Sequence, residues 1–450
     1  MVNVITELSK YVMALLLALY TLYGFWLVRK SDEEKSAALW QQNLFLIWLH
    51  LLGSLILYLN TQNEKVLYFC GVQLLFFAVF LTMHHLIYPK SDKLLNHNLL
   101  LFLSIGFLML SRLSFDKASR QFELAVLAAG VTFLIPFLIR KAGGLRNLSY
   151  LYAAAGLLLL LAVLIIGQLS FGAKLAITIH EITFQPSELV KILFVFFAAG
   201  MLYERQDVRQ VILTTALAAA HVLILVLSKD LGSALIYFVT YLVILYVATK
   251  KPLYFFSGLL AGSVAALIAW RLFSHVQTRV LAWSDPFSVI EKEGYQVSQS
   301  LFAIGTGGWF GLGLGQGMPY KIPVVEEDFI FAAIAEEFGI LFAIFLIFVY
   351  MSCFYMILNI AICLKDAYYK LIAVGLGTLV TFQVFLSIGG VIKFIPSTGV
   401  TLPFISYGGS SLLGMFCIWA IIQGMYLKRS DEVTEHGEDK KNKKAKKTRN

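Results

Sequence analysis

Long runs of apolar residues recur along nearly the whole chain, and short polar segments separate them. A helix that crosses the hydrocarbon core of a bilayer needs roughly 17–25 such residues, and the runs are close to that length. The strict alternation of apolar and polar residues that marks a half-buried strand is not seen, so no strands are expected. Because an open sheet cannot satisfy its backbone hydrogen bonds in lipid, the runs are predicted to be transmembrane helices.

The pattern predicts thirteen membrane spans, with ends placed to within a few residues. The first seven are Tyr11–Val28, Leu44–Leu59, Val66–Tyr88, Leu99–Leu110, Phe122–Ile139, Tyr150–Gln168 and Pro186–Tyr203. The other six are Val211–Leu227, Leu231–Ala248, Leu253–Phe273, Phe338–Leu364, Leu371–Ile388 and Ser411–Leu427. No signal-peptide cleavage pattern follows the first run, so it is counted as a helix. The expected fold class is all-α, a polytopic integral membrane helical bundle.

The composition supports this fold class. Of the 450 residues, 59% are hydrophobic and 14% are charged. Soluble globular domains have about 25% charged residues, so the chain falls well outside that class.

Basic residues gather in alternate connections between the spans. These connections read "VRKSDEEK", "YPKSDK", "IRKAGGLRN", "YERQDVR", "ATKKP" and "LKDAYYK", and the tail "KKNKKAKKTRN" lies on the same side. The positive-inside rule therefore places the C-terminus in the cytoplasm and, with an odd number of spans, the N-terminus outside. Residues 429–450 are expected to form a disordered basic tail. Because this tail supplies much of the net charge of +9, no nucleic-acid partner is expected.

The longest connection, residues 274–337, is predicted to lie outside, and loops of this length are usually functional. It contains the glycine-rich stretch "GTGGWFGLGLGQG", from Gly305 to Gly317. No strand precedes this stretch, and it lies on the wrong side of the membrane for ATP, which disfavours a nucleotide site. The glycines instead indicate a tight backbone that approaches its neighbours closely.

The same connection ends in "VVEEDFIFAAIAEEFG", which holds five carboxylates in a very apolar chain. Asp328 directly precedes Phe329 and Ile330, and an acid held among apolar groups at a lipid interface is costly unless it is used. Glu326 and Glu327 are expected to be solvated loop charges. The last two acids, Glu336 and Glu337, are expected to orient the loop or to meet backbone donors at a helix N-terminus.

Further polar residues lie at the outer ends of other spans. Glu188 and Lys191, in "FQPSELVKI", are three residues apart and share one helix face. Asp230, in "SKDLGSALI", starts another span. An ion pair of this kind can be purely structural, and the sequence leaves that alternative open. The convergence of these groups with Asp328 on the outer half predicts a polar cavity that opens outward.

Five motifs together resemble the shape, elongation, division and sporulation (SEDS) family, the RodA/FtsW/SpoVE polymerases. They are "FQPSELVK", "KDLGSALI", "QSLFAIGTGGWFGLGLGQG", "EEDFIFAAIAEEFG" and "PSTGVTLPFISYGGSSLL", in the order of the family. The resemblance covers residues 99–427 and implies a ten-helix SEDS core within residues 90–428, with the large extracellular loop 274–337. Residues 1–89, with about three extra transmembrane helices, match no part of it. The family usually has a proline before the aspartate of "SKDLG", and this chain has Lys229.

The resemblance implies a peptidoglycan glycosyltransferase that polymerises lipid II at the outer face of the cytoplasmic membrane. By the same resemblance Asp328 matches the essential loop acid and would be the catalytic general base. The expected substrate-binding residues are Lys191, Glu188, Asp230, Arg279 and Ser410. A divalent cation, Mg²⁺ or Mn²⁺, is a further expectation, held by Glu188 and Asp230.

A class B penicillin-binding protein is the expected partner. Two alternatives to a polymerase remain at this point, a lipid II flippase and a non-catalytic scaffold for a penicillin-binding transpeptidase. The sequence does not decide between a role in division, elongation or sporulation.

Overall fold

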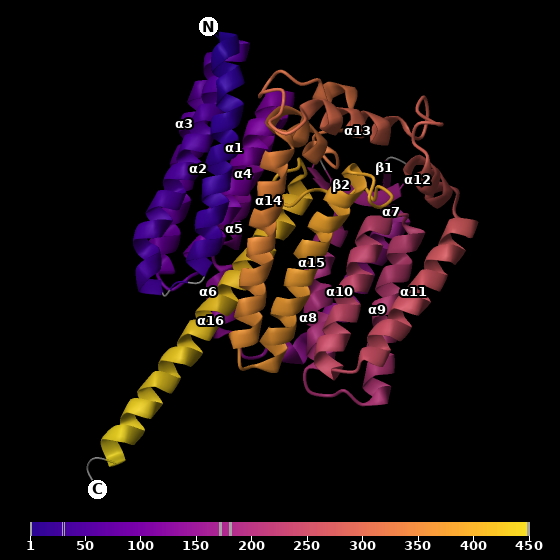
Figure 1. The fold of residues 1–450 in the computed structure, drawn as a ribbon. Coiled ribbons are helices and arrows are strands. Elements are labelled where there is room, and N and C mark those ends of the chain that lie inside the picture. Colours follow the sequence, from indigo (N-terminus) through magenta and orange to yellow (C-terminus); the bar gives the residue numbers. More distant parts are fainter. Residues whose placement is uncertain (1, 29, 31, 171–172, 180–181, 448–450) are drawn as a thin grey trace.

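The chain forms a bundle of long helices in a computed structural model, with a small cap of loops, short helices and one sheet at one end (Figure 1). The structure describes residues 2–28, 30, 32–170, 173–179 and 182–447. The two ends of the chain lie at opposite ends of the bundle (Figure 1), which agrees with the odd number of predicted spans. The cap lies at the end that holds the N-terminus.

The helices of the first part are α1 (Val2–Val28), α2 (Asp32–Thr61), α3 (Glu64–Ile87), α4 (Lys93–Leu113), α5 (Phe115–Thr132), α6 (Ile135–Lys141), η1 (Leu145–Leu148) and α7 (Ser149–Ile166). Those of the middle are α8 (Pro186–Leu202), α9 (Val208–Leu227), α10 (Leu231–Thr249), α11 (Pro252–Leu272), α12 (Ser274–Ser284) and α13 (Tyr295–Gly307). The last are η2 (Pro319–Lys321), α14 (Ile330–Cys363), α15 (Ala367–Val391) and α16 (Gly409–Lys447).

Each of the thirteen predicted spans coincides with one of these helices, except that α5 and α6 share Phe122–Ile139. Twelve helical segments among the described residues are long and apolar enough to cross a membrane. The remaining predicted span is α8, a helix of 17 residues. The fold class is therefore confirmed as a nearly all-α polytopic membrane bundle. Several helices are longer than the predicted spans: α2 begins at Asp32 rather than at Leu44, and α14 begins at Ile330 rather than at Phe338.

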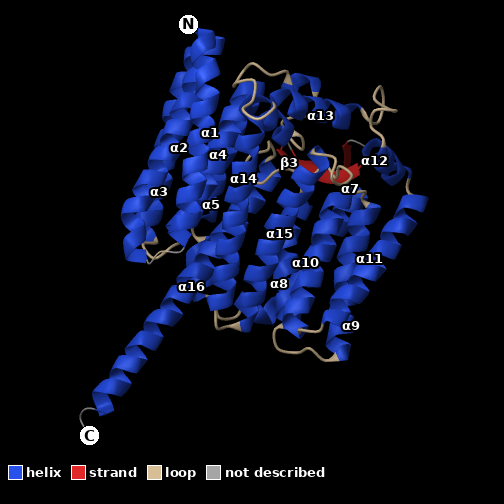
Figure 2. Ribbon diagram, in the orientation of Figure 1, coloured by secondary structure: helices blue, strands red, loops and turns tan. Residues whose placement is uncertain are grey.

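A three-stranded antiparallel sheet joins α7 to α8, and the expectation of no strands is wrong here (Figure 2). The strands are β1 (Gln168–Ser170), β2 (Ala173–Ile179) and β3 (Ile182–Phe184), in the order β1-β2-β3. Their residues include "AITI" and "ITF", rich in the β-branched side chains that suit strands. The sheet lies in the connection between α7 and α8. The length of apolar runs predicts membrane spans, but it does not predict short strands in a connection.

The last helix is longer than the predicted span, because α16 continues to Lys447 and projects from the bundle (Figure 1). The disorder expected for residues 429–450 stays a prediction, and residues 448–450 lie outside the described part of the chain. The segment contains many Lys and Glu residues and no proline, and Lys and Glu are good helix formers.

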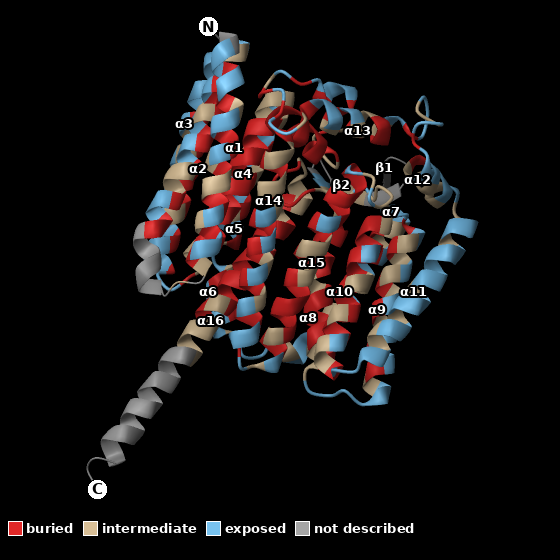
Figure 3. Ribbon diagram, in the orientation of Figure 1, coloured by how far each residue is buried: buried red, intermediate tan, exposed pale blue. Residues whose placement is uncertain are grey.

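Burial divides the bundle into a central and a peripheral set of helices (Figure 3). The apolar window of α4 is 94% buried, and those of α15 and α16 are 78% and 72% buried. By contrast α11 buries none of its residues, so it lies at the edge. The N-terminal helices α1–α3 lie along α4, α5 and α14 (Figure 1).

Polar side chains tie the N-terminal helices to the central ones. The Tyr20 hydroxyl donates to Asn98 Oδ1 over 2.9 Å, and His50 Nδ1 lies 2.9 Å from Ser104 Oγ. Inside a membrane, hydrogen bonds between helices add to van der Waals packing as a source of helix association. The extra helices are thus packed into the bundle rather than held apart from it.

Candidate active site

A polar cluster lies at the capped end of the bundle. We use this name for the five residues Glu188, Lys191, Asp230, Arg279 and Asp328, which come from α8, from the start of α10, from α12 and from the loop before α14. The segment of residues 392–408 between α15 and α16, called the strap below, crosses the cluster. The structure thus brings together five of the six residues that the sequence had singled out.

Glu188 and Lys191 form the buried part of the cluster. Pro186 at the first position of α8 favours helix initiation, and Glu188 lies in the first turn, where negative charge is stabilised. Lys191 Nζ lies 2.8 Å from Glu188 Oε2, and the two side chains are 1% and 9% exposed. An ammonium group this deeply buried needs partners, because desolvation of a charge costs several kcal/mol.

Lys191 also joins the cluster to the strap. Its Nζ donates to Gln383 Oε1 over 2.9 Å, and Gln383 Nε2 donates to the Thr401 carbonyl over 3.1 Å. Sequence reasoning missed Gln383, although a lone amide inside an apolar span is a recognisable signal of function. The chain of bonds shows that Lys191 has a structural task in addition to any contact with substrate.

Asp230 caps the N-terminus of α10. Its carboxylate accepts hydrogen bonds from the Ser233 backbone N–H over 3.1 Å and from Ser187 Oγ over 3.3 Å. Burial raises the pKa of the Asp230 carboxyl, and the bonds from Ser233 lower it. Lys229, the residue before it, has a φ of 64°, which a proline ring cannot adopt. The departure from the family's proline therefore comes with a different backbone turn.

Arg279 and Asp328 face each other across the strap. Arg279 Nη1 donates to the Ser397 carbonyl over 3.2 Å. Gly399 has a φ of 70°, and a β-carbon there would lie 3.9 Å from both Arg279 Nη2 and Asp328 Oδ2. Glycine thus leaves a space that both side chains border.

The Asp328 carboxyl has the environment of a base that works near neutral pH. Burial raises its pKa to about 7, and the charges of Glu327 and Glu326 act in the same direction. The positive charge of Arg279 and a hydrogen bond from the residue's own backbone act against this shift. A carboxylate whose pKa lies near the working pH is suited to proton transfer.

Glu326 was expected to be a solvated charge, and this is wrong. Its carboxylate pairs with Lys117 Nζ of α5, and its carbonyl accepts from the Tyr407 N–H over 2.8 Å. The side chain is 17% exposed. Lys117 lies 209 residues away in the chain, so the pairing has no local signal. Glu327 is half-buried as well, and burial raises its pKa.

The glycine loop, residues 308–317, wraps around a break in α14. The break is at Gly339, where φ is 88° and ψ is 168°. Leu312 N–H donates to the Glu336 carbonyl and Gly313 N–H to the Glu337 carbonyl, each over 2.9 Å. A β-carbon at Gly311 would lie 2.2 Å from the Glu337 carbonyl oxygen, so only glycine permits this approach.

The side chains of the last two acids also bind this loop. Glu337 Oε2 accepts from the Gly315 N–H over 3.0 Å, and Glu336 Oε1 accepts from the Met318 N–H over 3.0 Å. Glu337 Oε1 lies 3.1 Å from Arg112 Nε of α4. Of the two alternatives expected for these acids, orientation of the loop is therefore confirmed, and the backbone donors are those of Gly315 and Met318 rather than those of a helix N-terminus. The two acids lie inside α14 and not at its start.

Ser410 lies at the start of α16, next to the cluster. Its hydroxyl accepts a hydrogen bond from the Gln185 N–H over 3.0 Å, at the residue that precedes α8. The neighbouring Ser411 hydroxyl lies 2.8 Å from Thr401 Oγ1 of the strap. Ser410 thus joins the start of α16 to the residue before α8, and Ser411 joins it to the strap. A contact of Ser410 with substrate stays a prediction.

Among the described residues no group of three or more His, Cys, Asp or Glu side chains has the arrangement of a metal site. Glu188 and Asp230 supply two carboxylates, and each already has protein partners. Mg²⁺ is commonly held by one or two carboxylates together with substrate phosphates. The pair therefore fits a cation that substrate oxygens help to bind, rather than a site made by the protein alone.

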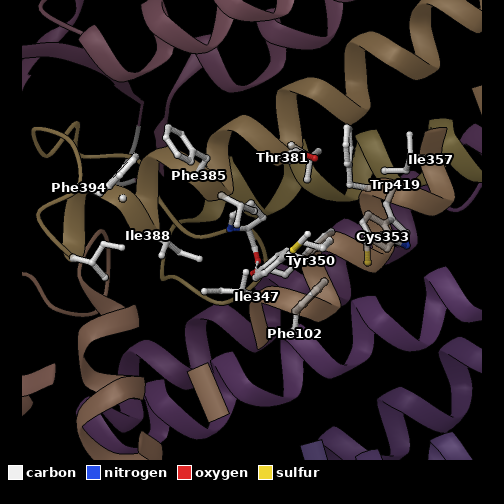
Figure 4. A pocket seen from close by; sticks show the side chains of 18 residues that line it. Phe102, Ile347, Tyr350, Cys353, Ile357, Thr381, Phe385, Ile388, Phe394 and Trp419 are labelled. Atoms are coloured by element: carbon white, nitrogen blue, oxygen red, sulfur yellow. Dashed lines mark hydrogen bonds between the residues drawn. The ribbon is translucent and has the colours of Figure 1, made fainter. Parts of the chain in front are cut away.

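An apolar cavity of about 310 Å³ lies between α14 and α15 (Figure 4). Its lining is almost wholly apolar and includes Phe102, Tyr350, Phe385, Ile388, Phe394 and Trp419. Chemistry on a sugar pyrophosphate requires charged and hydrogen-bonding groups, and this cavity has very few. The polar cluster is therefore the better candidate for the reaction centre.

Comparison with known proteins agrees with the motifs. The sequence model of the FtsW/RodA/SpoVE family, described as "Cell cycle protein", matches residues 92–430. The peptidoglycan glycosyltransferase RodA of Mycobacterium leprae is 32% identical over 392 residues, which cover 81% of this chain and 84% of that protein. The stage V sporulation protein E of Bacillus subtilis is 32% identical over 346 residues, 72% of this chain and 93% of that protein.

Solved structures show the same fold. The structure "Structural coordination of polymerization and crosslinking by a peptidoglycan synthase complex" matches with a TM-score of 0.64 and 26% identity, over 75% of this chain and 98% of that one. The rod shape determining protein RodA of Thermus thermophilus matches with a TM-score of 0.57 and 25% identity, over 76% of this chain and 98% of that one. These matches confirm the resemblance seen in the five motifs: the chain belongs to the FtsW/RodA/SpoVE family of cell cycle proteins.

Proposed function

We propose that this chain is a peptidoglycan glycosyltransferase that polymerises lipid II into glycan strands at the outer face of the cytoplasmic membrane. The names of its relatives support the activity. The observation that carries the proposal is the placement of Asp328, a partly buried acid with a pKa of about 7, opposite Arg279 at one end of a membrane bundle. The reacting groups of a lipid-linked sugar lie at the membrane surface, which is where this end of the bundle is expected to be.

The reaction joins two sugars and releases a polyprenyl pyrophosphate. The 4-hydroxyl of an acceptor GlcNAc attacks the anomeric carbon of a donor MurNAc, and the bond from that carbon to the pyrophosphate oxygen breaks. Asp328 accepts the proton of the hydroxyl as the new C–O bond forms. Arg279 carries positive charge beside Asp328 and is the group placed to stabilise the negative charge of the leaving pyrophosphate.

The buried residues of the cluster support these two. Lys191 with Glu188 sets the position of Gln383 and the strap, and adds positive charge beneath the site. A divalent cation, Mg²⁺ or Mn²⁺, held by Glu188, Asp230 and the pyrophosphate oxygens, would supply further charge neutralisation when bound.

The most direct test is polymerisation of labelled lipid II by the purified protein, alone and with a class B penicillin-binding protein. The relation to a solved peptidoglycan synthase complex supports that partner class. Glycan strands that form with the partner present, and only in the presence of this chain, are the expected result. Facilitated transfer of lipid II across vesicles without any polymer would favour a flippase. Unchanged polymer formation by the Asp328→Asn variant would favour a scaffold.

The rate of polymerisation is expected to depend on pH through Asp328. The base must be ionised, and its pKa is raised from 3.8 to about 7, so activity is lost as the pH falls below about 7. The logarithm of kcat/KM should rise with pH along a limb centred near 7 and then level off. In Glu327→Gln this midpoint should move to lower pH, because the charge of Glu327 contributes to the raised pKa. A limb centred near 4 would contradict the assignment.

The orientation of the bundle is expected to place Asn450 inside and Met1 outside. A cysteine introduced at position 64, at the start of α3, should react with an impermeant reagent on intact cells. One introduced at position 365, between α14 and α15, should react only after lysis. The background should carry Cys363→Ser, because that thiol is exposed. Labelling with the opposite sidedness would place the polar cluster on the cytoplasmic face and contradict the proposal.

A further inference from the structure

The N-terminal helices, which lie outside the family match, contact the glycine loop directly. Asn60 Nδ2, at the end of α2, donates to the Leu314 carbonyl over 2.8 Å. The ring of Tyr11 in α1 packs against Phe310, with 4.9 Å between ring centroids. A β-carbon at Gly313 would lie 3.2 Å from Thr6 Cγ2, also in α1. Helices α1 and α2, which match no part of the family core, therefore contact the glycine loop of that core.

The opposite side of the glycine loop is bonded to α14. Backbone bonds join it to the carbonyls of Glu336 and Glu337. The Glu337 carboxylate accepts from the Gly315 N–H within the loop, and the Glu336 carboxylate accepts from the N–H of Met318, the next residue after it. Arg112 adds a bond from Nη2 to the Gly317 carbonyl over 3.2 Å while its Nε holds Glu337. The loop thus lies between the N-terminal helices and the point where α14 breaks.

The part of α14 before the break acts as a short arm. It comprises residues 330–338, begins two residues after Asp328, and ends where the glycine loop holds it. At about 1.5 Å per residue the arm is about 13 Å long. A tilt of about 5° about the held end would move the Asp328 end by about 1 Å. A misplacement of this size can lower a reaction rate by about 10².

We propose that α1 and α2 position the catalytic Asp328 through this route, with Asn60 and Tyr11 as positioning residues. The inference rests on the proposed function, since it assigns the task of the N-terminal helices to the same reaction. Bonds deeper in the bundle, from Tyr20 to Asn98 and from His50 to Ser104, fix the two helices against α4. The two helices that contact the glycine loop are thus themselves fixed by hydrogen bonds to α4.

The chemistry of the Asn60 contact allows a sharp test. Asn60→Asp keeps the shape of the side chain but replaces the donor by a carboxylate, which faces the Leu314 carbonyl as one acceptor against another. Asn60→Leu keeps a similar size and removes the bond without adding charge. The matched control is Asn63→Asp, which caps α3 three residues further on, where Asp serves as well as Asn.

The experiment measures kcat, KM for lipid II and thermal unfolding of the full chain with its partner. Both Asn60 variants should lower kcat, Asn60→Asp by about tenfold or more, with KM and the unfolding temperature close to wild type. Asn63→Asp should match wild type. In an Asp328→Asn background, Asn60→Asp should cause no further loss, because the effect passes through Asp328.

Three results would overturn the inference. They are a wild-type kcat in Asn60→Asp, a loss confined to KM, and a loss that follows only the amount of folded protein. A failure of the proposed function is distinguishable, because then Asp328→Asn itself would retain wild-type polymerisation.

Discussion

Asp328→Asn should nearly abolish polymerisation while leaving the protein folded and bound to its partner. The substitution keeps the size and most of the hydrogen bonding of the side chain, but it removes the base. General-base steps typically contribute about 10²–10⁴-fold to a rate. The measurement is the rate of glycan formation from labelled lipid II at pH 8, where the wild-type carboxylate is ionised according to its pKa of about 7.

The fold of this variant can be checked through its own pH dependence. Burial raises the pKa of Asp328 in the folded state, so ionisation of the wild-type carboxyl destabilises that state as the pH rises from about 4 through about 7. Asp328→Asn should therefore unfold at the same temperature as wild type at low pH and at an equal or higher temperature at pH 8. Glu327→Gln, in the same loop, is the matched control and should retain near-normal polymerisation at pH 8. If Asp328→Asn forms long glycan strands at a wild-type rate, Asp328 is not the base.

Lys191→Ala is expected to have the second largest effect, on stability as well as on activity. It leaves the Glu188 carboxylate buried without its 2.8 Å partner and breaks the bond to Gln383. Removing one partner of a buried ion pair typically costs about 3–5 kcal/mol. Polymerisation should fall further than the loss of folded protein accounts for, because the ammonium also supplies charge toward the pyrophosphate and holds the strap.

The double variant Lys191→Met with Glu188→Gln separates these two effects. It removes both charges and keeps similar volumes, so the unfolding temperature should recover toward wild type. Polymerisation should stay low, because neither the positive charge nor the bond to Gln383 returns. The control is the ion pair of Arg146 and Asp366 at the other end of the bundle, whose removal should leave polymerisation unchanged. Near-normal polymerisation in the double variant would show that the pair only holds helices together.

Several features of the candidate site could be read from single stretches of sequence. Glu188 and Lys191 are three apart on one helix, and their pairing follows from that spacing. The glycines of residues 305–317 indicated close backbone approach, and Gly311 shows it. Asp328 stood out because it adjoins Phe329 and Ile330, which are fully buried. In each case the signal lies within a few residues of the feature that it predicts.

Other features depend on contacts between distant segments. Lys117 with Glu326, Arg112 with Glu337 and Asn60 with Leu314 are pairs separated by more than two hundred residues. Glu326 looks solvated in the sequence only because its partner belongs to α5. The sheet after α7 and the clasp of the glycine loop around Gly339 are likewise invisible to a pattern of apolar runs.

The sequence by itself determined the position and order of the long apolar helices, because the transfer of about twenty apolar residues into lipid is a local property of each run. It also determined which acids and bases lie at the capped end, through their positions at the ends of those runs. Apart from the pair of Glu188 and Lys191, only the tertiary structure decided which of them meet. Packing of distant segments brings Arg279 of α12 near Asp230 and Asp328, and it sets α1 and α2 against the glycine loop. Those contacts depend on side-chain shape and on polar pairing between helices, and neither can be predicted from a single segment of the sequence.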